Sequence, residues 1–142
     1  MKRLIIPFAF LCFLFMACPP LPHHYMYGYE IEYVSIGRAD SEYILLKEGT
    51  IKYVQNNQDT LSNSLRKRDY KALYNFLNGF KLDSLEVIQV PSKKYLYDGA
   101  LATTLTVTDL NPKQYKSPTF DHDNPPEKIK GFIEYIKKIS KR

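Results

Sequence analysis

The chain has 142 residues, a formal net charge of +5 and 44% hydrophobic residues. This length is enough for one domain with a single hydrophobic core. The excess of positive charge is mild and the lysines are spread along the chain, which argues against the basic stripe of a nucleic-acid-binding protein. The only basic triplet, 66–68, is expected to be a solvated helix end. Two cysteines are present, and one lies in the N-terminal apolar run, so the remaining chain has no pair for a disulfide or a cysteine-type zinc site.

The N-terminus up to Cys18 has the layout of a bacterial export signal. Lys2 and Arg3 form a short basic start, and an apolar run of 14 residues covers 4–17 before the cysteine. A membrane-spanning helix needs roughly 20 residues, so this run is too short to span a bilayer. We therefore expect residues 1–17 to be a signal peptide and the protein to be exported to the cell envelope.

Residues 15–18 resemble a lipobox, the pattern in which a cysteine receives lipid. Ala17 and Cys18 match this pattern, whereas Phe15 and Met16 depart from its usual branched and small residues. The resemblance implies a diacylglyceryl thioether on Cys18 and an amide-linked acyl chain such as palmitate, which together give a stable membrane anchor. It also implies an outer-membrane lipoprotein, because a proline rather than an aspartate follows the cysteine. Plain signal-peptide cleavage without lipid and an uncleaved anchor are the alternatives.

Proline-rich sequence separates the cysteine from the rest of the chain. Three prolines within 19–22 favour an extended polyproline segment, which makes a short and stiff tether. The expected organisation is a signal peptide over 1–17, a lipidated cysteine with its tether over 18–28, and a single α+β domain over 29–142.

Alternation of apolar and polar residues predicts the strands. Tyrosine or isoleucine recurs at every second position from 25 to 33, which places these side chains on one face of a strand that ends at Ile36. We expect Tyr29 and Tyr33 to be buried beneath the helices, because such sheets bury one face. A two-residue turn at 48–49 contains the glycine that a tight hairpin needs. Further strands are expected over 42–47, 50–55, 60–65, 101–108 and 114–117.

Two amphipathic helices are predicted, one in each half of the domain. Apolar residues recur at helical spacing over 67–78, and Gly79 is expected to end this helix from the position beyond its last turn. The final helix is expected to begin at Asn124 as its N-cap, with Pro125 in the first helical position and Glu127 completing a capping box. Residues 91–98 are expected to be a loop.

These elements predict the α+β fold class, with a single antiparallel sheet and two amphipathic helices packed on one face. Four features carry a family resemblance: the hairpin Glu48–Tyr53, the helix Tyr70–Leu77, Asp98 before the threonine-rich strand, and Pro-Pro-Glu at 125–127. The chain resembles, over about residues 30–140, a family of small uncharacterised bacterial lipoprotein domains. The resemblance implies the order strand, strand, helix, strand, strand, helix, and it implies no activity.

Asp121, His122 and Asp123 form the densest group of potential metal ligands. They are weak candidates, because the glycine and distal glutamate of a calcium loop are missing and acidic residues are common before a helix. Glu30 and Glu32 lie about 7 Å apart on one strand face, a spacing that suits glycosidase chemistry and equally the solvent face of a sheet. No serine lies in a Gly-x-Ser-x-Gly elbow. We therefore expect no catalytic residue, no metal and no cofactor.

Tyr25 and Tyr27 are the candidate binding surface, because tyrosine stacks on sugar rings and is enriched at protein interfaces. The sequence therefore favours a lipid-anchored, non-catalytic envelope protein that binds a protein or glycan partner. A cell-envelope hydrolase built around 121–123 and an inhibitor of a secreted enzyme are the alternatives. No nucleic-acid partner is expected for an exported chain.

Overall fold

The structure, a computed structural model, describes residues 28–142. The predictions for the signal peptide, for Cys18 and for Tyr25 and Tyr27 lie outside the described residues. Within 28–142, the chain folds into α+β structure with one antiparallel sheet and two α-helices, which confirms the predicted class. No helix in this part of the chain has both the length and the apolarity needed to cross a bilayer.

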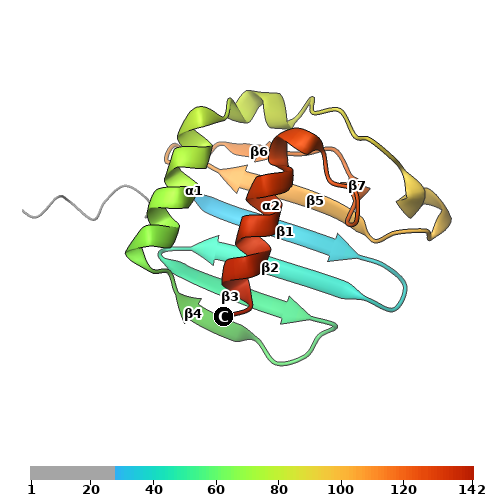
Figure 1. Cartoon of the computed structure of the whole chain (residues 1–142), viewed down its shortest axis with the longest axis horizontal. Coiled ribbons are helices and arrows are strands. Elements are labelled where there is room, and N and C mark those ends of the chain that lie inside the picture. The colour runs from blue at the N-terminus through green and yellow to red at the C-terminus, as the bar shows by residue number, and fades with distance from the viewer. Residues whose placement is uncertain (1–27) are drawn as a thin grey trace, which may run out of the picture.

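Seven antiparallel strands form the sheet, and β1 lies at its centre between β2 and β5 (Figure 1). The strand order is β4-β3-β2-β1-β5-β6. The short β7 pairs with the start of β5, whereas β6 pairs with its end. All six predicted strands are present, and their ends lie within one residue of the prediction. The seventh strand, β7, was not predicted, because two residues are too few to show the alternation of a strand. The strands are β1 (Glu30–Ile36), β2 (Ser41–Lys47), β3 (Thr50–Gln55), β4 (Leu61–Ser64), β5 (Ala102–Thr108), β6 (Gln114–Lys116) and β7 (Phe120–Asp121).

Helices α1 (Lys67–Gly79) and α2 (Glu127–Ser140) lie across the same face of the sheet, as predicted (Figure 1). Two short 3₁₀ helices, η3 (Leu82–Leu85) and η4 (Lys94–Tyr97), lie between α1 and β5. η4 replaces the loop predicted for 91–98. The sequence therefore predicted both α-helices but not the short helices, whose single turns are too brief to show a 3.6-residue period.

Every second residue of the central strands faces the helices. In β1, Ile31 and Tyr33 are buried, which confirms the prediction for Tyr33. Tyr29, one residue before β1, was predicted to be buried but is only half-buried against the core. Farther along the same face, the hydroxyls of Ser35 and Thr103 lie 2.8 Å apart in a buried hydrogen bond, which satisfies both polar groups. The rest of the core between sheet and helices includes Ile44, Leu46, Ile51, Leu73, Leu77, Leu105, Val107, Phe120, Ile129, Phe132, Ile133 and Ile136.

Both helix ends differ from the predicted caps. α2 begins at Glu127, and Pro126 is its N-cap with no side-chain capping bond, so the predicted capping box is wrong. The Asn124 amide instead donates to Ser92 Oγ at 2.8 Å, a partner distant in sequence. At the other helix, Gly79 is the last helical residue rather than the residue beyond it, and extended Phe80 is the C-cap. The Phe80 backbone N–H donates to the Leu77 carbonyl, and its side chain packs against the core.

Candidate functional site

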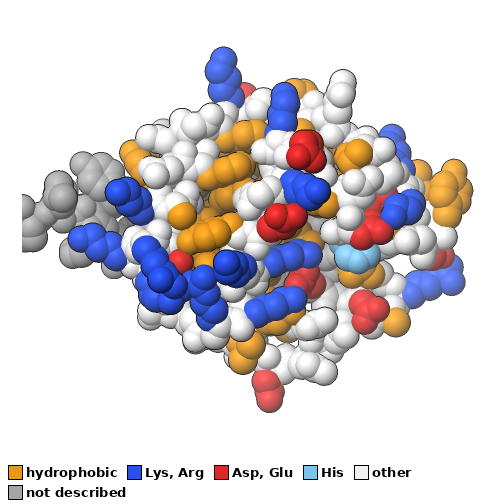
Figure 2. Space-filling view, in the orientation of Figure 1, with side chains coloured by type: hydrophobic (Ala, Val, Ile, Leu, Met, Phe, Trp, Pro, Cys, Tyr) orange, Lys and Arg blue, Asp and Glu red, His pale blue; other side chains and the backbone are white. Residues whose placement is uncertain are grey.

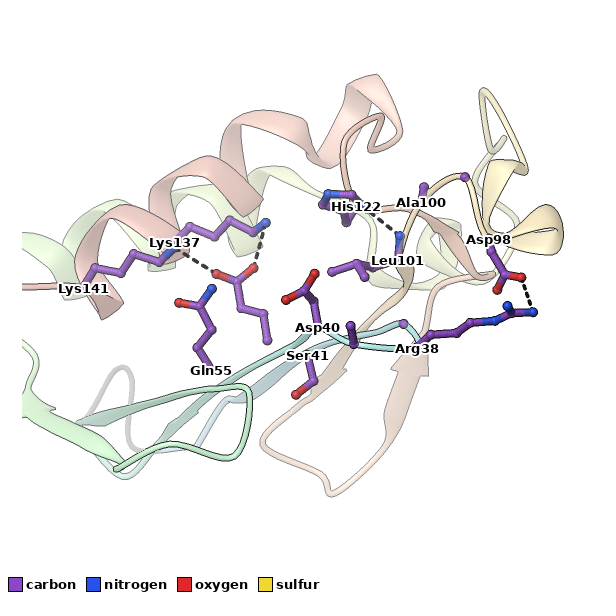
Figure 3. Close-up of a pocket in the computed structure, with 14 residues that line it drawn as sticks. Arg38, Asp40, Ser41, Gln55, Asp98, Ala100, Leu101, His122, Lys137 and Lys141 are labelled. Atoms are coloured by element: carbon purple, nitrogen blue, oxygen red, sulfur yellow. Dashed lines mark hydrogen bonds and ion pairs between the residues drawn. The ribbon is translucent and has the colours of Figure 1, made fainter.

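A cleft of about 580 Å³ lies where the β1–β2 turn, the segment before β5 and the last turns of α2 meet (Figure 3). The turn and the segment contribute small residues, which leave the space open: Gly37, Ala39, Gly99 and Ala100. Polar side chains surround this space from elements far apart in sequence. They are Arg38, Asp40, Ser41, Glu42, Gln55, Asp98, His122, Lys137 and Lys141.

Glu42 of β2 holds the last turns of α2 at one wall of the cleft. Its carboxylate lies 2.9 Å from Lys137 Nζ and 3.1 Å from Lys141 Nζ, and the side chain is only 12% exposed. The two lysines are one helical turn apart, so a single carboxylate reaches both. Burial alone would raise the pKa of Glu42, but the two ammonium groups outweigh burial and hold the pKa below its ordinary value. The Lys137 ammonium also lies 4.8 Å from the ring centroid of buried Tyr33.

A second ion pair lies at the mouth of the cleft, where Arg38 Nη2 and Asp98 Oδ2 are 2.6 Å apart (Figure 3). Both side chains are exposed, so this pair contributes little to stability and is free to exchange partners. Asp40 in the β1–β2 turn accepts a hydrogen bond from Asn56 Nδ2, and Asn56 Oδ1 accepts one from the Ser41 amide. These bonds fix the turn against the end of β3.

Among the sequence candidates within residues 28–142, His122 is the one whose side chain lines the cleft. Its Nδ1 accepts a hydrogen bond from the backbone N–H of Leu101 at 3.0 Å. The neutral ring therefore carries its proton on Nε2. A Ser-His-Asp triad needs the opposite arrangement, in which Nδ1–H donates to a carboxylate. His122 and Ser41 consequently do not form a serine-hydrolase site, although both line the cleft.

Asp121 and Asp123 face different partners from His122. Asp121 is fully buried and accepts hydrogen bonds from Ser92 Oγ and from the amides of Lys94 and Tyr95, which caps η4. Burial alone would raise the pKa of Asp121, but the hydrogen bond from Ser92 and those from the two amides hold it below its ordinary value. Asp123 pairs with Lys94 Nζ at 2.6 Å. Between residues 28 and 142, no three His, Cys, Asp or Glu side chains converge as metal ligands.

Glu30 and Glu32 lie on the sheet face opposite the helices, in alternation with the buried residues of β1. Glu30 pairs with Lys47 of the neighbouring strand at 2.9 Å. Tyr43 of β2 has a raised pKa, first because it is partly buried and second because Glu32 lies nearby. The two glutamates therefore take part in cross-strand contacts on the second face of the sheet.

Exposed apolar side chains are next in sequence to residues that line the cleft, and sequence analysis did not single them out. Ile36 comes directly before the β1–β2 turn and is 57% exposed, while Leu96 and Tyr97 of η4 are 60% and 85% exposed. Leu96 and Tyr97 come directly before Asp98 and Gly99, which line the cleft. We call Leu96 and Tyr97 the apolar rim. Ile36 alternates with buried Ser35, so it lies on the sheet face opposite the helices and is not part of the rim.

The chemistry of the cleft suits recognition of a charged peptide segment better than recognition of a sugar. None of its 14 described lining residues is phenylalanine, tyrosine or tryptophan, so they offer no large aromatic face on which a sugar can stack. It offers instead paired charges of both signs beside an exposed tyrosine, the residue type enriched at the centres of protein interfaces. A second cleft of about 560 Å³ lies between η3 and the start of α2. Only Glu127 and Lys128 carry charge there, so it has less polar chemistry to offer.

Comparison of this chain with protein-family models, with curated proteins and with solved structures found no match. The site's chemistry and the sequence pattern of the N-terminus are therefore the grounds for a functional assignment.

Proposed function

We propose that this chain is a lipid-anchored, non-catalytic protein of the cell envelope, held in the outer membrane through Cys18, that binds a protein partner. The anchor rests on the sequence pattern of residues 1–18. The binding role rests on one observation: the exposed apolar rim of Leu96 and Tyr97 comes directly before Asp98 and Gly99, which line a cleft of paired charges. Aromatic and aliphatic anchors surrounded by polar groups are typical of protein interfaces.

Binding is favoured over catalysis because the reactive groups near the cleft already have partners. Glu42 is held by two lysines, Asp121 by three donors and His122 Nδ1 by a backbone amide. A general acid or base needs a free group within reach of the substrate, and a nucleophile needs an adjacent base. An inhibitor of a secreted enzyme is one form of the proposed function, with the enzyme as the partner.

We expect Leu96→Ala combined with Tyr97→Ala to weaken binding to envelope fractions by about tenfold or more, because interface aromatics are frequent hot spots. Binding is measured with the full membrane-anchored chain, by chemical cross-linking in cells and by pull-down from envelope extracts. Val87→Ala is the matched control, since Val87 is 77% exposed and lines the second cleft. A variant with Tyr25→Ala and Tyr27→Ala tests the surface predicted from sequence. If that variant loses binding while the η4 variant keeps it, the tether and not the apolar rim is the binding surface.

The anchor has its own test in the intact mass of the protein isolated from its native membrane. We expect the mass of residues 18–142 with three acyl chains on Cys18, because the leader is removed and the new N-terminus is acylated. Cys18→Ser should abolish the added mass and release the protein from the membrane fraction. A bare thiol at Cys18 in the native protein, or a retained leader, contradicts the anchor.

A further inference from the structure

Basic side chains gather where the first turns of α1 meet the end of α2 (Figure 2). All the members of this group are exposed, and they come from segments about 70 residues apart in the sequence. We call the group the basic patch. It consists of Arg66, Lys67, Arg68, Lys71, Lys138 and Arg142.

The contacts of Asp69 in the first turn of α1 hold this group together. Its carboxylate lies 2.9 Å from Arg66 Nε and 3.2 Å from Arg142 Nη1, and Arg68 Nε lies at 3.8 Å. Tyr135 of α2 also donates to this carboxylate, at 2.9 Å. Lys138 follows Tyr135 by three residues, which places it on the same side of α2, towards α1.

The basic patch is strongly positive despite these contacts. Asp69 is buried beneath the guanidinium groups, so they and not the carboxylate meet the solvent. Lys67, Lys71 and Lys138 form no ion pair within the described part of the chain. The exposed carboxylate of Glu134 lies one turn before Lys138 and is the acidic group of α2 that adjoins the patch.

The charge is also polarised across the molecule. Without Lys2 and Arg3 of the predicted leader, the net charge falls from +5 to +3, while the patch alone has six cations. The rest of the domain is therefore net negative, and the molecule has a positive end. A polarised charge distribution orients a protein at a charged surface, even when its net charge is small.

The patch lies at the end of the sheet where the chain enters the domain. Glu30 at the start of β1 pairs with Lys47, and Gly49 in the following turn accepts a hydrogen bond from the Leu65 amide, one residue before Arg66. Figure 1 shows the start of β1 beside α1. Gly28 is ten positions after Cys18 in the sequence, and a chain spans at most about 3.6 Å per residue, so this end stays within about 36 Å of a lipid on Cys18.

We propose that the basic patch docks this domain on the anionic phospholipid headgroups of the membrane in which Cys18 is anchored. The proposal rests on the lipid anchor for proximity, and on the six cations for the contact. Clustered Lys and Arg beside a membrane anchor are attracted to anionic lipid, and the attraction acts within about one Debye length, about 8–10 Å at physiological salt. Docking through this end leaves the β1–β2 turn, which lines the cleft, at the opposite end of β1 and away from the bilayer (Figure 1).

The test measures vesicle binding by the chain from Pro19 onward, which lacks the leader and Cys18. This chain contains all of the core that the structure describes for residues 28–142. The probes are vesicles of phosphatidylcholine alone and of phosphatidylcholine with phosphatidylglycerol, and the readout is co-sedimentation across a salt series. We expect binding to the anionic vesicles only, with an affinity that falls as salt rises.

The test variant carries Lys67→Glu, Lys71→Glu and Lys138→Glu, which reverses three unpaired cations and spares the contacts of Asp69. Each basic contact at an anionic surface is worth about 1 kcal/mol, so we expect affinity to fall by about a hundredfold. The control carries the same charge change away from the patch, through Lys52→Glu, Lys116→Glu and Lys128→Glu. Thermal unfolding followed by circular dichroism shows whether both variants remain folded.

Equal losses in the two variants would overturn the proposal, because net charge and not the patch would then govern binding. Equal binding to neutral vesicles would also overturn it, as would binding of inorganic polyphosphate or a single-stranded oligonucleotide without binding of anionic vesicles. This test is independent of the anchor. If vesicle binding fails, the docking proposal is wrong, but the lipid anchor on Cys18 is unaffected. If the mass measurement shows a bare Cys18, the anchor is wrong, but the measured affinity of the patch for vesicles still stands.

Discussion

Replacing Phe132 of α2 with alanine is expected to lower the free energy of unfolding by about 3–5 kcal/mol, the usual cost of deleting a buried aromatic ring. The Phe132 side chain is buried, and its ring stacks on Phe76 of α1 with centroids 4.3 Å apart and planes 16° apart. The ring thus fills the space between the two helices above the sheet. Deleting it removes both the buried area and the contact that holds the helices against each other.

Urea unfolding at equilibrium checks this expectation. Phe132→Leu serves as the control, because a hydrophobic residue of similar volume should cost less than about 1.5 kcal/mol. Phe76→Ala should fall between the two, since Phe76 is only half-buried. A cost for Phe132→Ala no greater than that for Phe132→Leu would show that the helices do not depend on this stack.

Replacing Asp69 with alanine is expected to destabilise the domain by about 3 kcal/mol, near the lower end of the cost of breaking a buried ion pair. Asp69 is buried, and its carboxylate accepts hydrogen bonds from Arg66, Arg142 and the Tyr135 hydroxyl. Without the carboxylate, Tyr135 and the guanidinium groups lose their shared acceptor. Water replaces part of that interaction, because both arginines are partly exposed, and this keeps the cost from being larger.

The same residue predicts a loss of stability in acid. Burial alone would raise the pKa of Asp69, but hydrogen bonds from Arg66 and Tyr135 outweigh it and lower the pKa below its ordinary value of 3.8. A carboxyl group with a lowered pKa in the folded state stabilises the protein above its unfolded pKa, and the effect is lost as pH falls through the folded pKa. In unfolding experiments from pH 7 down to pH 2, the free energy of unfolding should therefore fall more steeply in the natural protein than in Asp69→Ala.

Asp83→Ala is the control for both measurements. Asp83 pairs with Lys113 on the surface, where both side chains are exposed, so its removal should change neither stability nor the acid dependence appreciably. If Asp83→Ala and Asp69→Ala unfold alike, the contacts of Asp69 do not join α1 to α2 energetically.

Local sequence patterns predicted the regular elements closely because these patterns act over a few residues. Alternation placed Ile31 and Tyr33 on the buried face of β1, and the observed burial agrees. The turn at Glu48 and Gly49 has positive φ at both residues, 48° and 80°, which is the geometry that the glycine indicated. Each of these features depends on residues that are neighbours in the chain.

The helix caps were predicted less well because they compete with distant partners. Asn124 precedes a helix in a sequence typical of an N-cap, yet its side chain donates to Ser92, 32 residues earlier. Asp121 of β7 similarly accepts a hydrogen bond from the amide of Tyr95 in η4, 26 residues earlier, and does not cap the start of α2. A local pattern specifies what a polar side chain is able to do, and the packing of the loops decides which partner it finds.

The sequence by itself determined the α+β class, the strand and helix positions and the apolar faces, because backbone hydrogen bonds and side-chain periodicity are local. Only the tertiary structure decided which side chains meet. The cleft joins a turn near residue 40 to the end of α2, and the basic patch joins the start of α1 to Arg142. Charges that are far apart in the sequence become neighbours because the strand order and the packing of the two helices bring distant segments together. Sequence spacing alone does not predict that proximity.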